Sequence, residues 1–266
     1  MSNEKPALLV ERHGHVAVIV INDAPVNRLS LEFMDELEVL LPTLAEDMSV
    51  RAIVIRGAGN ENFSVGMNLK QLLQGVEQKG GIDALLDQRL RVLSTIENLE
   101  KPVIAVMVGY CLGGGLELPL ACHFRLAAEE GAQIGLPELD IGTVPAWGGT
   151  ARLTRCVGRD QALDIILRAK KISGPQALKI GLVHEVWPND QLQGKALELA
   201  QELAAKPPIQ VAGVLRAVVG AEHASLEEAL QVEREAVHLA SKSKHQQEGM
   251  MAFLEKREPD FSTDPV

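Results

Sequence analysis

The stretch VGYCLGGGLELPLACHFRLAAEEGAQIGLPELDIGTVPAWGGT, from Val108 to Thr150, decides how the rest of the chain is interpreted. It follows the apolar, β-branched run Val103–Met107, which predicts a buried strand ending in glycines. Glycines 113–115 then lead into a helical pattern that begins at Leu116. Because a helix N-terminus offers unpaired N–H donors and a positive dipole end, we expect the Gly114 N–H to favour negative charge.

Two glutamates accompany this glycine turn. Glu117 lies three residues after Gly114 on the same helical face, among leucines where a carboxyl is rarely buried without a reason. Glu138 follows Pro137, whose fixed φ favours a tight turn. A solvent-directed Glu117 and an ordinary turn acid at Glu138 are the simpler alternatives. A carboxyl beside an anion-stabilising amide nevertheless suits acid/base chemistry on a carbonyl compound.

The segments GYCLGGGLEL and IGLPELDIGTVPAWGGTARLTRCVG, in this order, resemble the signature of the crotonase (enoyl-CoA hydratase/isomerase) superfamily, and the likeness extends over nearly the whole chain. The resemblance implies an α/β fold, a crotonase-like spiral of strand-strand-helix units with a C-terminal helical trimerisation region. The expected division is a catalytic core over residues 1–195 and the trimerisation region over 196–266. The implied substrates are acyl-CoA thioesters. No separate cofactor is expected, since coenzyme A is part of the substrate, and the implied assembly is a homotrimer or a dimer of trimers.

The same resemblance assigns the proposed chemistry. The backbone N–H groups of Met67, in SVGMNL, and Gly114, in LGGGLE, match the family's oxyanion hole. Glu117 and Glu138 match the pair of acids in enoyl-CoA hydratases, where one glutamate deprotonates water for attack at Cβ and the other supplies a proton to Cα. The implied function is hydration of a 2-enoyl-CoA. An enoyl-CoA isomerase, which uses a single glutamate and adds no water, is the alternative.

Substrate-binding residues also follow from the resemblance. The loop 64–68 with Lys70 is expected to hold the pantetheine and the nucleotide, while Phe253 and Lys256 are expected to reach the coenzyme A of a neighbouring subunit. Met67-Asn68 replaces the family's common Ala-Asp pair, and His123 replaces a frequent Asp, so we expect a preferred acyl group other than simple crotonyl. The expected substrate-binding residues are Ser64, Val65, Gly66, Asn68, Lys70, Trp147, Phe253 and Lys256.

The composition excludes several other classes of protein. With 266 residues, 46% of them apolar, the chain can bury a substantial core. Its net charge of −10 argues against a nucleic-acid surface, and the group Arg168, Lys170 and Lys171 supplies too few cations for one. No apolar run approaches the roughly 18 residues of a membrane span. The N-terminus lacks signal and transit-peptide features, so we expect a cytoplasmic protein with no membrane partner.

Cysteine and histidine spacing gives no sign of a metal site or a disulfide. Cys111, Cys122 and Cys156 are odd in number, and free thiols in a reducing compartment are expected. The seven histidines contain no H-E-x-x-H, and the pair in His13-Gly14-His15 predicts an exposed hairpin turn. An inactive scaffold is a further alternative, disfavoured because both glutamates are intact.

Hydrophobic periodicity predicts the remaining elements. Buried strands are expected at 16–21 and 52–55, separated by a helix whose stripe is Met34, Leu37 and Leu41 and which Pro42 should end or kink. A helix at 83–99 is expected to bury Leu86, Leu90 and Leu93. The tail face containing Leu226, Leu230 and Val237 needs a partner surface. Beyond Thr150 the expected helices are 159–168, 175–180, 189–205, 209–221, 226–240 and 246–256, with a strand at 183–187.

Overall fold

The computed structural model describes residues 5–263 and contains a six-stranded sheet in the order β1-β2-β3-β4-β6-β8. Strands β1 and β2 are antiparallel and all the other pairs are parallel. Every residue of β2 and β4 is buried, as expected for strands covered on both faces. The bounds are Leu8–His13 (β1), Val16–Ile21 (β2), Ala52–Gly57 (β3), Val103–Met107 (β4), Phe124–Ala128 (β6) and Glu185–Trp187 (β8).

A second, smaller parallel layer runs beside the ends of the large sheet. Strand β5 (Tyr110–Leu112) pairs with β7 (Gln133–Gly135), and isolated bridges join Ser64 to Cys111 and Leu29 to Met67. Strands β2, β3 and β4 are thus each followed by a short segment that pairs with its counterpart in the next unit. This repetition is the predicted strand-strand-helix spiral.

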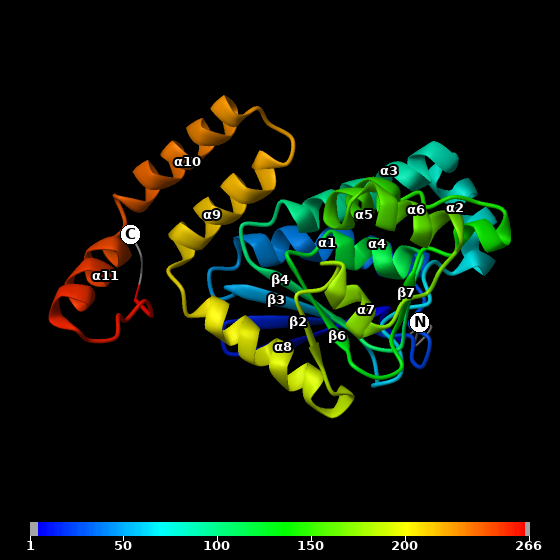
Figure 1. Cartoon of the computed structure of the whole chain (residues 1–266), viewed down its shortest axis with the longest axis horizontal. Coiled ribbons are helices and arrows are strands. Elements are labelled where there is room, and N and C mark those ends of the chain that lie inside the picture. Colours follow the sequence, from blue (N-terminus) through cyan, green and yellow to red (C-terminus); the bar gives the residue numbers. More distant parts are fainter. Residues whose placement is uncertain (1–4, 264–266) are drawn as a thin grey trace.

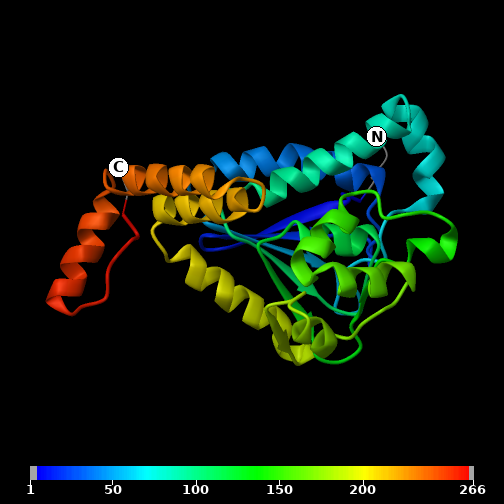
Figure 2. The same ribbon diagram turned by 45° about the horizontal axis from the view of Figure 1, so that its top comes forward.

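Helices cover both faces of the large sheet (Figures 1 and 2). Helices α1 (Leu31–Glu46) and α3 (Ile82–Glu97) lie on one face, and α8 (Asn189–Ala204) lies on the other. Along α8, Leu192, Ala196, Ala200 and Ala204 are buried at helical spacing. The proposed boundary at residue 195 falls inside α8, whose buried residues lie on both sides of that point. The division at 195 stays a prediction.

Two local expectations are wrong in part. Of the two effects expected of Pro42, an end or a kink, the end does not occur: helix α1 continues to Glu46, because Leu41 and Leu44 are buried on either side of the proline and hold the last turn against the core. Along helix α3, Leu93 is buried as expected, but Leu90 is exposed and Leu86 is only half-buried. The buried residues of α3 are Leu85, Gln88, Arg89, Val92, Leu93 and Ile96.

The shorter helices connect the two strand layers. Helix α4 begins at the predicted glycine turn, directly after Gly113, whose φ of 57° lies in the left-handed region that glycine tolerates. The predicted helices after Thr150 are present. The bounds are Leu69–Gln71 (η1), Leu72–Lys79 (α2), Gly114–Leu120 (α4), Glu138–Ile141 (η2), Gly149–Val157 (α5), Arg159–Leu167 (α6) and Gly174–Lys179 (α7).

The C-terminal helices α9 (Pro208–Ala221), α10 (Leu226–Ala240) and α11 (Lys244–Glu255) extend away from the core at the end opposite the N-terminus (Figure 1). Helices α9 and α10 pack as a hairpin, in which a Cβ on Gly213 would lie 2.9 Å from that of Ala236. Leu226 and Val237 are 75% and 59% exposed. The expected apolar face is therefore uncovered in the single chain, and its partner stays a prediction.

The cysteines are free, as expected. Cys111 and Cys122 are buried, and Cys156 is half-buried. Within residues 5–263, no helix is long and apolar enough to cross a membrane. The same part of the chain contains no cluster of three His, Cys, Asp or Glu side chains arranged to hold a metal ion.

Candidate active site

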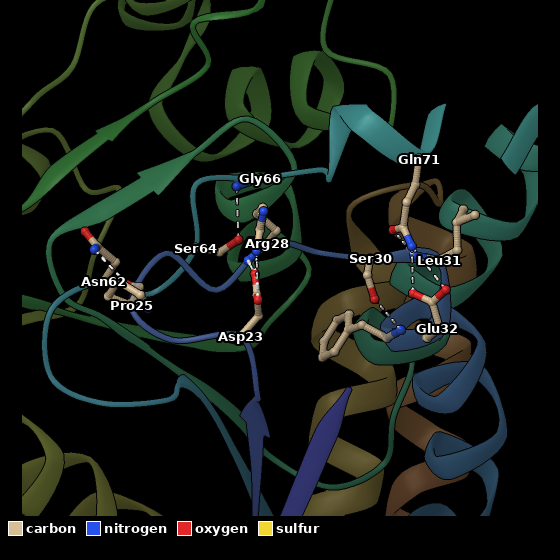
Figure 3. Close-up of polar contacts among 11 residues, drawn as sticks. Asp23, Pro25, Arg28, Ser30, Leu31, Glu32, Asn62, Ser64, Gly66 and Gln71 are labelled. Atoms are coloured by element: carbon tan, nitrogen blue, oxygen red, sulfur yellow. Dashed lines mark hydrogen bonds and ion pairs between the residues drawn. The ribbon is translucent and has the colours of Figure 1, made fainter. Parts of the chain in front are cut away.

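Hydrogen bonds fix the shape of the loop after β3, which carries four of the expected substrate-binding residues (Figure 3). The Gly66 N–H donates to the Ser64 hydroxyl at 3.0 Å, and the Ser64 side chain is fully buried. The Asn68 N–H donates to the Leu29 carbonyl at 3.1 Å. Gln71 accepts the Leu31 N–H at 3.1 Å, which ties η1 to the start of α1. Ser64 therefore shapes the loop with its hydroxyl.

This loop lies against the glycine turn at the start of α4. The Leu112 N–H donates to the Ser64 carbonyl at 3.0 Å, and a Cβ on Gly66 would lie only 3.4 Å from the Gly114 nitrogen. Among residues 5–263, nothing accepts a hydrogen bond from the N–H groups of Met67 or Gly114. The two expected donors thus sit on adjacent segments with their hydrogen-bonding capacity unused.

Glu117 is buried in α4 and held by backbone donors. Its Oε1 accepts the N–H of Trp147 at 2.7 Å and that of Gly149 at 2.8 Å, while its exposed fraction is 2%. Its Oε2 makes no hydrogen bond to the described part of the chain. Burial raises the pKa of Glu117 to about 7, although the two amides and Arg152 act to lower it. This carboxyl is poised to exchange a proton near neutral pH.

An ion pair supports the turn that holds Glu117. Arg152 of α5 donates to both carboxylate oxygens of Glu97, at 2.9 and 2.8 Å, and to the Trp147 carbonyl at 3.1 Å. The two side chains are only 12% and 19% exposed. A bidentate pair of this kind restrains orientation more tightly than a single contact. Arg152 therefore links α3 to the Trp147–Gly149 turn.

Glu138 begins the 3-10 helix η2 and approaches the glycine turn from the other side. Its Oε1 lies 3.0 Å from where a Cβ on Gly113 would be, and its buried Oε2 has no hydrogen-bond partner in the described chain. Burial raises the pKa of Glu138. A carboxyl with an unpartnered buried oxygen favours the protonated form, because the charged form would lack compensation.

Trp147 completes the group around Gly114. Its indole ring is buried, and a Cβ on Gly114 would lie 2.7 Å from the ring. Val65, Gly66, Met67 and Asn68 share the neighbouring loop, and Lys70 lies exposed on η1. Phe253, 83% exposed, and Lys256 lie at the end of α11, far from this site in the same chain (Figure 1).

Three residues at this site escaped the sequence analysis: Glu97, Arg152 and Arg89. Glu97 and Arg152 are 55 residues apart, and no local pattern joins them. Arg89 left a signal, because a cation at i+4 from Leu85 and i−4 from Leu93 lies on the apolar stripe of its helix. A helical wheel centred on Leu85 and Leu93 therefore identifies Arg89 as a cation on the buried face of α3.

These features define the class of protein. The sequence matches the enoyl-CoA hydratase/isomerase family over residues 11–264, and the chain belongs to this family, within the crotonase superfamily. The chain is therefore a hydro-lyase of the enoyl-CoA hydratase type.

Individual relatives agree with this membership. The chain is 40% identical over 250 residues to a probable enoyl-CoA hydratase of Bacillus subtilis, covering 92% of this chain and 95% of that protein. It is 33% identical to the short-chain-enoyl-CoA hydratase of Clostridium acetobutylicum, covering 94% and 95%. The crystal structure of an enoyl-CoA hydratase from Bacillus anthracis superposes with a TM-score of 0.91 at 34% identity, covering 97% of this chain and all of that one.

Proposed function

We propose that this protein adds water reversibly across the 2,3 double bond of 2-enoyl-CoA thioesters. The observation that carries the proposal is the meeting of Glu117 and Glu138 at one glycine turn, both with raised pKa values. Hydration needs a base for water and an acid for the α-carbon, and two buried carboxyls supply both. The relatives' names as enoyl-CoA hydratases support the same reaction.

The proposed steps assign one role to each group. The thioester oxygen accepts hydrogen bonds from the Met67 and Gly114 N–H groups, which stabilise the enolate as it forms. Glu117 removes a proton from water through Oε2, and the resulting hydroxide adds to Cβ. Glu138 gives its proton to Cα, so the product is a 3-hydroxyacyl-CoA. Proton exchange with solvent then resets both carboxyls.

The binding residues extend this proposal to the rest of the substrate. The backbone of Ser64 and Gly66 faces the glycine turn, so the segment from Ser64 through Val65 to Gly66, with Asn68 and Lys70, is proposed to hold the pantetheine and nucleotide. Trp147 and the Met67 side chain are proposed to border the acyl group. Phe253 and Lys256 act on a neighbouring subunit in this proposal, which requires a trimer or a dimer of trimers. The proposed location is the cytoplasm.

The experiment that tests the proposal separates hydration from isomerisation. A 2-enoyl-CoA incubated with the protein in H₂¹⁸O should give a 3-hydroxyacyl-CoA that carries one ¹⁸O, detected by mass spectrometry. An isomerase, in which one glutamate shuttles a proton, gives a 3-enoyl-CoA of unchanged mass. Formation of that isomer alone would overturn the hydratase proposal in favour of the alternative.

A further inference from the structure

Arg89 is a buried cation with two unused hydrogen-bond donors. It lies on the core-facing side of α3 and is 1% exposed. Its Nη1 donates to the neighbouring Gln88 side-chain oxygen, but Nε and Nη2 are buried without any partner in the described chain. Unpaired buried donors cost free energy, and more so when they carry charge. Such a group in a native core requires an explanation.

The acidic residues nearest to Arg89 do not pair with it directly. Gln88 stands between them, donating to Asp35 at 2.6 Å and to Glu38 at 2.8 Å. Asp35 also binds Lys79, and Glu38 also binds Arg91. Burial lowers the pKa of Arg89, but a guanidinium keeps its proton in proteins. Within the described part of the chain, a positive charge without a contacting anion therefore remains in the core.

This cation lies one side chain away from the proposed reaction centre. The Arg89 guanidinium carbon is 5.7 Å from the centroid of the Trp147 ring. The same ring is the neighbour that a Cβ on Gly114 would meet at 2.7 Å, and the Trp147 N–H binds Glu117. Helix α3 also approaches the turn through Leu90, whose Cδ2 lies 3.9 Å from a Cβ built on Gly148. Trp147 thus contacts both the charge and the glycine turn.

The two unused donors have a specific geometry. Nε–H and Nη2–H lie on the same edge of the guanidinium plane and point in the same direction. This edge is the fork that binds both oxygens of a carboxylate at once. A cation–π contact with Trp147 uses the charge alone and leaves the fork unused.

We propose that Arg89 receives the carboxylate at the far end of the acyl group, so that the preferred substrates are CoA mono-thioesters of 2-unsaturated dicarboxylic acids. This inference rests on the proposed function, because it places the acyl chain between the glycine turn and α3. The carboxylate supplies the missing counterion and satisfies both donors. Trp147 then borders the intervening carbons.

The test compares two substrates of equal chain length, 2-hexenoyl-CoA and the mono-thioester 2-hexenedioyl-CoA, which differ only in the terminal carboxylate. The measured quantity is the ratio of their kcat/KM values. We expect the wild type to favour the carboxylated thioester about 30- to 100-fold, which is about 2.0–2.7 kcal/mol at 1.36 kcal/mol per factor of ten. In Arg89→Met the ratio should fall to about one, because the fork and the charge are both removed.

Two further variants separate recognition from structure. Arg89→Lys keeps a cation beside Trp147 but lacks the fork, and should retain a ratio about tenfold below the wild type, since the point charge persists without bidentate geometry. Arg91→Met alters an exposed arginine of the same helix and should leave the ratio unchanged. A wild-type ratio near one, or an equal loss on both thioesters in Arg89→Met and Arg89→Lys, would show that Arg89 serves packing alone.

Binding of unreactive saturated analogues distinguishes this inference from the proposed function. Calorimetry with hexanoyl-CoA and adipoyl-CoA should show tighter binding of adipoyl-CoA, and Arg89→Met should abolish the difference. If that preference appears while neither unsaturated thioester is hydrated, the hydratase proposal fails and the role of Arg89 stands. If hydration occurs without any preference for the carboxylate, the role of Arg89 fails alone.

Discussion

Glu117 and Glu138 flank the same glycine turn, but the chain holds their carboxyls in opposite ways. Glu117 sits in an α-helix, and two backbone N–H groups bind one of its oxygens. Glu138 sits on a short 3-10 helix, with a buried oxygen that has no hydrogen-bond partner among residues 5–263. Bound donors stabilise a carboxylate, whereas an unpartnered oxygen favours the acid. One site can therefore contain a base and an acid built from the same residue type.

The largest expected effect comes from removing either carboxyl. Glu117→Gln and Glu138→Gln should each lower kcat for hydration by about 10²–10⁴-fold, the range typical of one acid/base group. The difference between the two residues should appear on a 3-enoyl-CoA, where Glu117→Gln keeps proton transfer between carbons and Glu138→Gln loses it. Chromatography coupled to mass spectrometry measures both reactions. Wild-type hydration by either variant would remove that residue from the mechanism.

The second prediction concerns how the stability of the folded chain depends on pH, and it tests the effect of burial on the two glutamates. A carboxyl whose pKa rises from 4.5 to about 7 on folding favours the folded state below its ordinary pKa, and that contribution disappears as pH rises through the folded value. Relative to Glu117→Gln, the wild type should therefore lose on the order of 3 kcal/mol of stability between pH 4.5 and 7.

Urea unfolding at a fixed protein concentration measures this loss, because the concentration of an oligomer affects its apparent stability. Glu138→Gln provides the matched comparison. Burial raises the pKa of Glu138 also, so a loss of stability of the same sign is expected as pH rises. A pH-independent difference between wild type and Glu117→Gln would contradict a raised pKa at Glu117.

The smallest expected effect comes from Arg152, which acts on Glu117 only through the turn and its charge. Arg152→Met removes the ion pair to Glu97, the bond to the Trp147 carbonyl and a cation that lowers the pKa of Glu117. The rising limb of kcat/KM against pH should move to higher pH, with about three- to tenfold lower activity below pH 7, since one pKa unit is a tenfold change in protonation. Arg155→Met, an exposed position on the same helix, should not move it. An unshifted profile in Arg152→Met would leave Arg152 a purely structural role.

Much of the fold was predictable from the sequence because its signals are local. The run Val103–Met107 is apolar and β-branched throughout, and it forms a wholly buried strand. The three-residue strands β5 and β7 were not predicted, since so short a segment has no period to detect and depends on its neighbour in the next unit. Pro42 does not end α1, because the buried leucines around it outweigh its low helix propensity.

The site also contains some residues that have a local sequence signal and some contacts that have none. Gly113–Gly115 and the two glutamates were identified because they lie within one short stretch of sequence. The bonds that distinguish the glutamates come from backbone N–H groups at 147 and 149, which have no sequence signature. The ion pair between Glu97 and Arg152 joins two helices, and only the folded chain brings these side chains together. The roles of Met67 and Gly114 stay predictions, supported by their unused donors.

The cysteines offer a practical way to observe this site. Burial raises the pKa of the Cys111 thiol well above its usual range and that of Cys122 to about 12, which leaves both unreactive toward alkylating reagents. Cys156 is half-buried on α5, the helix that begins at Gly149 and follows the turn holding Glu117. A maleimide fluorophore should therefore attach once per chain, at Cys156. Its emission would report movement of α5 during a single turnover, in a chain that carries no substitution.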